Sequence, residues 1–235
     1  MFLFSPALLA VSEQTTSVVR LVSIGAVVAL LAVVALIGFL SNGKKFDGKR
    51  LAFAGLSVAT AFTLCLIKFS PIQYGGSVTL ASFVPLLVYA YVYGVGEGLL
   101  IGLVHGLLNF IEDPYILTPA TFIFDYLLAF TSVGVMGLFG KMRRKEKECL
   151  PLVWGCVAVF SLRFLAHLCS GMIFFAENSI WVDFPAWAMS NAFAYSFIYQ
   201  CVYIPLDALI ATLTLVTLCK SGVFDRLLKI MKTNR

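Results

Sequence analysis

The sequence predicts an all-α integral membrane protein, because apolar residues dominate it and occur in long uninterrupted blocks. Of the 235 residues, 60% are hydrophobic and only 12% are charged, whereas about a quarter of the residues in a soluble domain are charged. Several blocks reach the roughly 20 residues that a helix needs to cross the hydrocarbon core of a bilayer. Backbone groups have no water partners there, and the alternation of a transmembrane β-barrel is missing, so these blocks should be helices.

Seven apolar segments are predicted along the chain. One extra transmembrane helix and a basic cytoplasmic connector occupy residues 1–50, a six-helix membrane domain occupies 51–220, and a basic cytoplasmic tail occupies 221–235. The last segment is too long for one crossing, so its first part should run along the membrane surface or within a loop. The segments are 18–40, 51–69, 78–93, 98–111, 119–140, 150–175 and 187–219.

Local signals justify the ends of these segments. The first lacks the charged leader and the cleavage site of a signal peptide, so it should be a retained helix. The second and the sixth each begin directly after a basic cluster. Gly94, Gly96 and Gly98 predict a tight turn between the third and fourth segments. Thr118 as a cap and Pro119 in the first turn begin the fifth, and Pro205 can kink the seventh.

Three clusters of basic residues set the expected orientation, because positively charged loops stay in the cytoplasm. Four segments separate the first cluster from the second and two separate the second from the third, so all three can lie on one side. We therefore expect a multi-pass protein of a prokaryotic cell membrane, with its amino terminus outside and its carboxyl terminus in the cytoplasm. The net charge of +5 then indicates topology and attraction to anionic lipid rather than to nucleic acid. The clusters are Lys44, Lys45, Lys49 and Arg50; Lys141, Arg143, Arg144, Lys145 and Lys147; and the basic residues of 226–235.

The sequence lacks the signatures of catalysis and of nucleotide hydrolysis. We find no zinc-protease motif, no nucleophile elbow and no phosphate-binding loop. We therefore expect neither an enzyme nor a transporter that hydrolyses ATP by itself. The six cysteines show no C-x-x-C pairing, so free thiols are expected, without a metal site or a cofactor.

Charged residues within apolar segments are the candidates for function, because a charge inside a bilayer costs about 2.5 kcal/mol or more. Arg163 and His167 are four residues apart and share one helix face. Asp125 lies about 9 Å along the helix that begins at Pro119. It could form an ion pair with Arg163 or act as the counter-ion of a cationic ligand. A histidine such as His167 more often forms only a structural hydrogen bond between helices. Aromatic residues at the same depth would suit a flat, positively charged heteroaromatic compound.

Other polar residues in the apolar segments are expected to be structural. Gly102 and Gly106 favour close helix packing with a hydrogen-bonded His105 over ligand contact. Asp207 follows a proline and should satisfy backbone groups at a kink rather than sense protons. Lys68 should extend to the outer surface.

Three sequence blocks carry a resemblance to a known family. They are residues 114–126 (PYILTPATFIFDY), residues 163–175 (RFLAHLCSGMIFF), and Ala194-Tyr195-Ser196 followed by Gln200. With their spacing, residues 51–219 resemble the thiamine-specific substrate-binding (S) components of energy-coupling factor (ECF) transporters. The resemblance implies a six-helix membrane protein that binds its vitamin with high affinity near the outer surface. It also implies a transmembrane coupling protein and two cytoplasmic ATPases as partners, and toppling of the S component to carry the vitamin inward.

The resemblance further implies a set of site residues. Asp125 takes the place of an acid that contacts the ligand, His167 that of a pocket histidine, and Phe175 that of a stacking ring. Gly55 and Ala59 lie where the family has a small-residue face for the coupling protein. The implied substrate-binding residues are Asp125, His167, Tyr195, Gln200, Tyr126, Tyr115, Phe175 and Trp181.

Several of these positions depart from the family pattern. Asp125 replaces a glutamate, Phe175 a tryptophan, Gln200 an asparagine, and Gly76 a tryptophan of the first outer loop. The ligand could therefore be thiamine or a related heteroaromatic compound, such as a thiamine precursor or another vitamin, and Trp181 could restore stacking area.

Two other classes of function stay open on the residues alone. A stand-alone proton-coupled carrier could use Asp207, His105 or Glu97, but it should show an internal repeat, which we do not find. A membrane enzyme or assembly scaffold is disfavoured because no nucleophile, base and orienting group occur at recognisable spacing.

Overall fold

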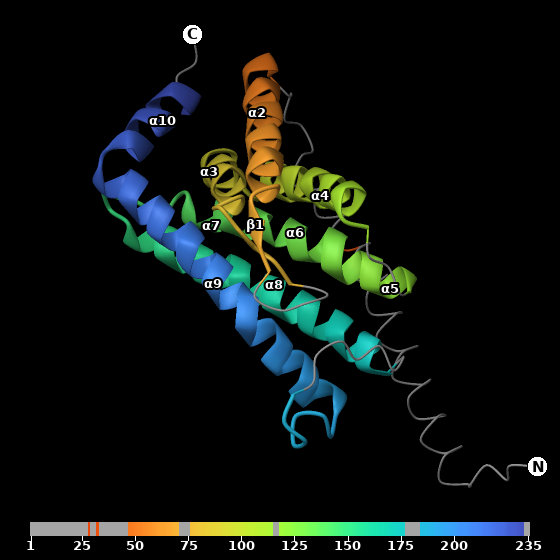
Figure 1. Cartoon of the computed structure of the whole chain (residues 1–235). Coiled ribbons are helices and arrows are strands. Elements are labelled where there is room, and N and C mark those ends of the chain that lie inside the picture. Colours follow the sequence, from red (N-terminus) through yellow and green to blue (C-terminus); the bar gives the residue numbers. More distant parts are fainter. Residues whose placement is uncertain are drawn as a thin grey trace, which may run out of the picture.

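The computed structural model describes residues 28, 32, 47–70, 76–114, 118–176 and 184–232. Within these ranges the chain is almost entirely helical and includes one short antiparallel hairpin (Figure 1). In chain order the elements are α2 (Gly48–Cys65), β1 (Lys68–Phe69), β2 (Val78–Thr79), α3 (Phe83–Tyr93), α4 (Val95–Glu112), α5 (Pro119–Phe122), η1 (Ile123–Leu128), α6 (Ala129–Thr131), η2 (Ser132–Val135), α7 (Met136–Phe139), α8 (Leu150–Ala176), α9 (Ala192–Lys220) and α10 (Val223–Lys232).

Four of the described helical segments are long and apolar enough to cross a bilayer. They are α4, the continuous run from α5 to α7, α8 and α9. The protein is thus a mostly helical membrane protein, as the composition predicts. Helices α8 and α9 run side by side, and α4 packs along the run from η1 to η2 (Figure 1). The extra helix predicted over residues 18–40 lies outside the described residues, apart from Val28 and Ala32.

The hairpin is the main departure from the predicted segments. Lys68 pairs with Thr79 and Phe69 pairs with Val78, so the second predicted helix ends in a strand and the third begins in one. Strands of two residues are too short to show an alternating pattern, and their apolar composition therefore resembled that of a helix. Lys68 extends from β1 to Glu112 and Asp113, at 3.0 and 2.9 Å.

Two other helix ends have clear local causes. Gly94 alone separates α3 from α4, with φ of +99°, a conformation that residues with a side chain rarely adopt; Gly96 and Gly98 lie within α4. Helix α9 begins at Ala192, where the Asn191 side chain accepts a hydrogen bond from the Ala194 amide. The first part of the predicted segment 187–219 is therefore outside the helix, as expected from its length.

Glycines bring the backbone of α4 against the run from η1 to η2. A Cβ at Gly102 would collide with the Phe130 carbonyl oxygen, and one at Gly106 would collide with the Tyr126 carbonyl oxygen. The predicted close packing is thus confirmed. The predicted hydrogen bond of His105 is wrong: this residue is fully buried, packs edge-on against Phe130 with ring centroids 5.2 Å apart, and has no hydrogen-bond partner among the described residues.

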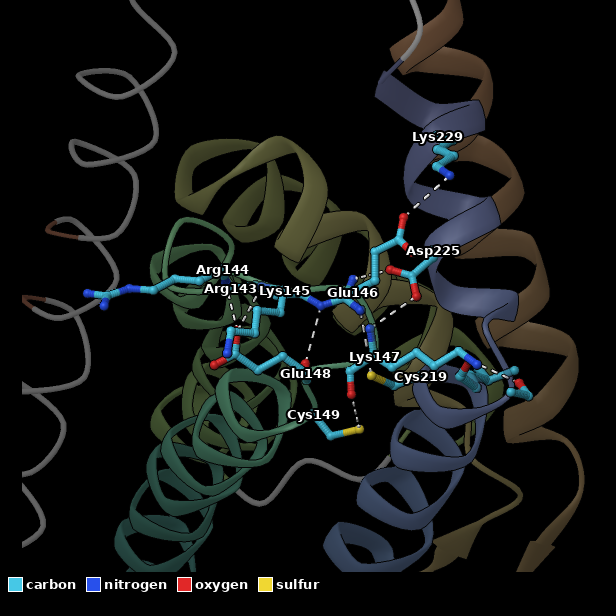
Figure 2. Close-up of polar contacts among 12 residues, drawn as sticks. Arg143, Arg144, Lys145, Glu146, Lys147, Glu148, Cys149, Cys219, Asp225 and Lys229 are labelled. Atoms are coloured by element: carbon cyan, nitrogen blue, oxygen red, sulfur yellow. Dashed lines mark hydrogen bonds and ion pairs between the residues drawn. The ribbon is translucent and has the colours of Figure 1, made fainter.

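At the basic end of the bundle, the loop between α7 and α8 is fastened to α10 (Figure 2). Arg143 forms a 2.7 Å ion pair with Asp225, and both side chains are largely buried. The Arg143 guanidinium lowers the pKa of the Asp225 carboxyl through this hydrogen-bonded contact. Because the carboxyl has a depressed pKa in the folded state, the pair stabilises the fold at pH values above the ordinary pKa of an aspartate. This stability is lost as the pH falls through the folded pKa.

We expect Asp225→Asn to lower the melting temperature of the purified protein by several degrees, since it leaves the Arg143 charge with one partner fewer and costs about 1–2 kcal/mol. Thermal unfolding in detergent at neutral pH measures the change. The matched control is Glu146→Gln, because the Glu146–Lys229 pair is exposed on both sides and should contribute almost nothing. Equal melting temperatures for the two variants would show that the Asp225 pair does not fasten the loop.

Candidate functional site

A cavity of about 480 Å³ lies at the end of the bundle opposite the basic cluster. Its walls come from the second half of α8, the first half of α9, η1 and α6, the end of α4, and the residues flanking the hairpin strands. This volume is typical of small-molecule sites. The lining residues are Ser70, Gly76, Ser77, Asn109, Asp113, Asp125, Tyr126, Phe130, Arg163, His167, Ser170, Gly171, Phe174, Tyr195, Ser196, Tyr199, Gln200 and Tyr203.

An irregular helix presents Asp125 to this cavity. The Thr118 side chain accepts a hydrogen bond from the Thr121 amide, and the Thr121 side chain accepts one from the Thr118 amide, so a capping box begins the helix at Pro119. The helix then widens into the π-helical η1, which contains Asp125. A π-turn fits an extra residue into the helix and often occurs at functional sites.

The Asp125 carboxylate is held by two side chains of α8. One oxygen lies 2.7 Å from His167 Nδ1, and the other accepts a hydrogen bond from the Ser170 hydroxyl at 2.5 Å. On its other side, His167 Nε2 accepts from Arg163 Nε at 3.4 Å. These roles place the imidazole proton on Nδ1, so that a neutral His167 donates to an ionised Asp125.

Asp125 therefore does not form the ion pair with Arg163 that the sequence left open. Arg163 is paired with Asp207 instead, at 3.0 Å. Asp207 was expected to satisfy backbone groups at a proline kink, and this prediction is also wrong. Its carboxylate instead binds Arg163 and the hairpin residue Thr79.

A stripe of residues four apart on α9 forms the facing wall. Tyr195, Tyr199 and Tyr203 lie along it, with ring centroids of successive tyrosines about 6 Å apart. Gln200 Nε2 donates to the His167 carbonyl at 3.1 Å, which orients the amide and leaves Oε1 as a buried acceptor. Neither this oxygen nor the Ser196 hydroxyl has a partner among the described residues. Buried polar atoms are rarely left unsatisfied, so these two atoms are candidates for contact with a polar ligand.

The other residues that the resemblance implies do not all line the cavity. Tyr126 lines the cavity and donates to the Asp113 carbonyl at 2.6 Å. Phe175 packs against Tyr195 with ring centroids 5.5 Å apart, but its neighbour Phe174 lines the cavity. Tyr115 and Trp181 lie outside the described residues.

Sequence reasoning missed several residues of this cavity, among them Tyr203, Ser170 and Ser196. A Cβ at Gly76 would overlap the ring of Tyr203, so Tyr203 fills the space beside the position for which the resemblance implies a tryptophan. Its four-residue spacing from Tyr199 was a signal that could have identified it. Ser170 and Ser196 had no such signal, because small hydroxyl residues are common in membrane helices.

Comparison with known proteins agrees with this architecture. Residues 51–224 match the model of the family described as thiamine transporter protein (Thia_YuaJ). The thiamine transporter ThiT of Bacillus subtilis (strain 168) is 28% identical over 190 residues, which cover 77% of this chain and 94% of that protein.

A solved structure of ThiT from Listeria monocytogenes is similar with a TM-score of 0.65 at 22% identity, covering 76% of this chain and 96% of that chain. It shows that the two chains share a fold. Because the family match extends over residues 51–224, well over half of the sequence, the chain belongs to the thiamine transporter family, the ThiT-type S components of ECF transporters.

Proposed function

We propose that this chain binds thiamine in the cavity between η1, α8 and α9. The observation that carries the proposal is the Asp125 carboxylate, which His167 and Ser170 hold in the wall of a cavity lined by tyrosines. Thiamine joins a positively charged thiazolium ring to an aminopyrimidine ring. A fixed carboxylate and aromatic faces are the groups that bind a flat organic cation through charge pairing, stacking and cation–π attraction.

The polar atoms of the cavity complement the aminopyrimidine as well. Each carboxylate oxygen of Asp125 has a second lone pair for a ligand N–H. Gln200 Oε1 is a fixed acceptor without a partner among the described residues, and an exocyclic amine would satisfy it. A ligand that lacks either ring would leave part of the cavity unfilled.

Isothermal titration of the purified protein in detergent tests this proposal. The titrants are thiamine, its pyrimidine half, its thiazole half and riboflavin. We expect thiamine to bind most tightly, each half more weakly, and riboflavin not at all. Tighter binding of the pyrimidine half than of thiamine would make a thiamine precursor the substrate, and failure of all four to bind would contradict the proposal.

We also propose how the site is oriented and coupled. The basic end lies in the cytoplasm by the positive-inside rule, so the cavity opens toward the outside. Helices α2 and α3 join the four spanning segments in a six-helix bundle. A transmembrane coupling protein and two ATPases then drive import, and the coupling protein contacts the exposed face of α2 that contains Gly55 and Ala59.

Gly55→Trp should preserve thiamine binding and abolish energy-dependent uptake. A Cβ at Gly55 meets no atom within 4 Å, so the substitution leaves the bundle intact, but its bulk prevents close helix contact with a partner. Uptake of labelled thiamine by vesicles containing the coupling protein and the ATPases measures the effect. The control is Leu209→Trp, which changes an exposed position of α9.

Full uptake by the Gly55→Trp variant would exclude this face as the coupling surface. Accumulation of thiamine against a gradient by the protein alone would instead favour the stand-alone carrier.

A further inference from the structure

Arg163 presents a problem for any cavity that receives a cation. It lines the cavity, and only 7% of its surface is exposed. Its guanidinium lies 4.2 Å from the ring centroid of Phe83 and 5.1 Å from that of Phe130. A buried positive charge in this position would repel a positively charged ligand.

Asp207 lies against Arg163. Its Oδ2 is 3.0 Å from Arg163 Nη1, and the two side chains are 4% and 8% exposed. Asp207 does not itself line the cavity. Within the described residues, it is the acid that forms an ion pair with Arg163.

The charges around the cavity show what Asp207 changes. Asp125 and Arg163 cancel, and the hydrogen bonds of His167 indicate a neutral ring. Asp113 is paired with Lys68 at the rim and is 67% exposed, so solvent screens it. When the solvent-screened Asp113–Lys68 pair is set aside, Asp125, Arg163 and Asp207 together carry a net charge of −1, and without Asp207 the sum is zero.

We propose that Asp207 is a positioning residue that neutralises Arg163 and thereby makes the cavity favour a cationic ligand over a neutral one. This inference rests on the proposed binding of thiamine in this cavity. Arg163 donates a hydrogen bond to His167 Nε2 and so orients the imidazole. Asp207 balances the positive charge of Arg163, which would otherwise repel a cationic ligand.

Asp207 has a second contact that could produce an effect for another reason. Its Oδ1 accepts hydrogen bonds from the amide and hydroxyl of Thr79, at 3.2 and 3.0 Å. The Thr79 hydroxyl also lies 2.7 Å from that of Ser82. Asp207 thus fastens strand β2 to α9, close to Gly76 and Ser77 of the cavity wall. A test must separate this fastening from the charge.

The test compares thiamine with its pyrimidine half, 4-amino-5-hydroxymethyl-2-methylpyrimidine, which is neutral at neutral pH. Asp207→Asn keeps the size of the side chain and an acceptor for Thr79 but leaves the Arg163 charge unbalanced. We expect its affinity for thiamine to fall about 10- to 100-fold more than its affinity for the pyrimidine, as estimated for one unbalanced charge several ångströms from the ligand. Titration calorimetry measures both ligands.

Two further charge variants and one structural control complete the design. Arg163→Gln should raise the ratio of thiamine to pyrimidine affinity, and Arg163→Gln/Asp207→Asn should return it close to the wild-type ratio. Thr79→Val removes the hydroxyl bond to Asp207 without changing any charge, so it should leave the ratio unchanged. Thermal unfolding of each variant in detergent confirms that folded proteins are compared.

The proposal is overturned if Asp207→Asn weakens both ligands equally, if Thr79→Val reproduces its effect on the ratio, or if the double variant stays as unselective as Asp207→Asn. If Asp207→Asn does not fold, the Arg163→Gln and double variants still decide the question through the same ratio. Absence of thiamine binding by the unmodified protein would instead contradict the proposed function, and the first titration of the series detects this outcome.

Discussion

Asp125→Ala should weaken thiamine binding by about 100-fold or more. The substitution removes the negative charge that faces the ligand, and it leaves the His167 Nδ1–H and the Ser170 hydroxyl without their acceptor. Each buried polar group that loses its partner costs about 1–3 kcal/mol, and loss of the buried charge pair between Asp125 and a bound cation costs about 3–5 kcal/mol. Titration calorimetry in detergent measures the loss directly.

His167→Ala should reduce the affinity for thiamine less than Asp125→Ala does, because the carboxylate and its hydrogen bond from Ser170 remain.

Cys201→Ser is the matched control for both variants. Cys201 follows Gln200 on α9, but its side chain is exposed on the outside of the bundle. We expect the Cys201→Ser variant to bind thiamine as tightly as the unmodified protein does. Retention of full affinity by Asp125→Ala would show that the carboxylate does not bind the ligand.

Asp125→Glu provides an independent test of the geometry. Glutamate adds the methylene that the resemblance implies for this position, yet Asp125 already reaches both His167 and Ser170. The longer side chain must give up one of these contacts or enter the cavity. We therefore expect weaker binding than for the unmodified protein, and tighter binding would show that the cavity has room for the longer acid.

Gly106→Val should have the largest effect on folding. A Cβ at this position would collide with the Tyr126 carbonyl oxygen, and backbone cannot move aside as a flexible side chain can. Overpacking commonly costs about 1–3 kcal/mol, and a collision with backbone lies at or above the upper end of this range. Because Tyr126 follows Asp125, separation of α4 from η1 would also displace the carboxylate. We expect a large decrease in extractable folded protein and in thiamine affinity.

Fluorescence-detected size exclusion and thermal unfolding in detergent measure this effect. Gly55→Val is the matched control, since it introduces the same side chain into a helix at a position without neighbouring atoms within 4 Å. Gly106→Ala should lie between the two. Equal stability of the Gly106→Val and Gly55→Val variants would mean that α4 and η1 do not need this close contact.

The sequence alone determined the membrane class, the main helices and the candidate carboxylate and histidine. These features depend on local or additive properties: the length of apolar blocks, helix-breaking glycine and proline, and the cost of placing charge in a bilayer. The spacing of Arg163 and His167 on one helix face is equally local. The two-residue strands escaped prediction because they are shorter than any reliable local pattern.

Only the tertiary structure decided which side chains are partners. Arg163 binds Asp207, 44 residues away, and Asp125 binds His167, 42 residues away, although the sequence equally allowed Asp125 to bind Arg163. The π-helical turn at Asp125 and the meeting of Tyr203 with Gly76 likewise depend on how separate helices pack. Pairing in a buried site follows from the distance and direction between side chains on different helices, and no property of one helix fixes these quantities.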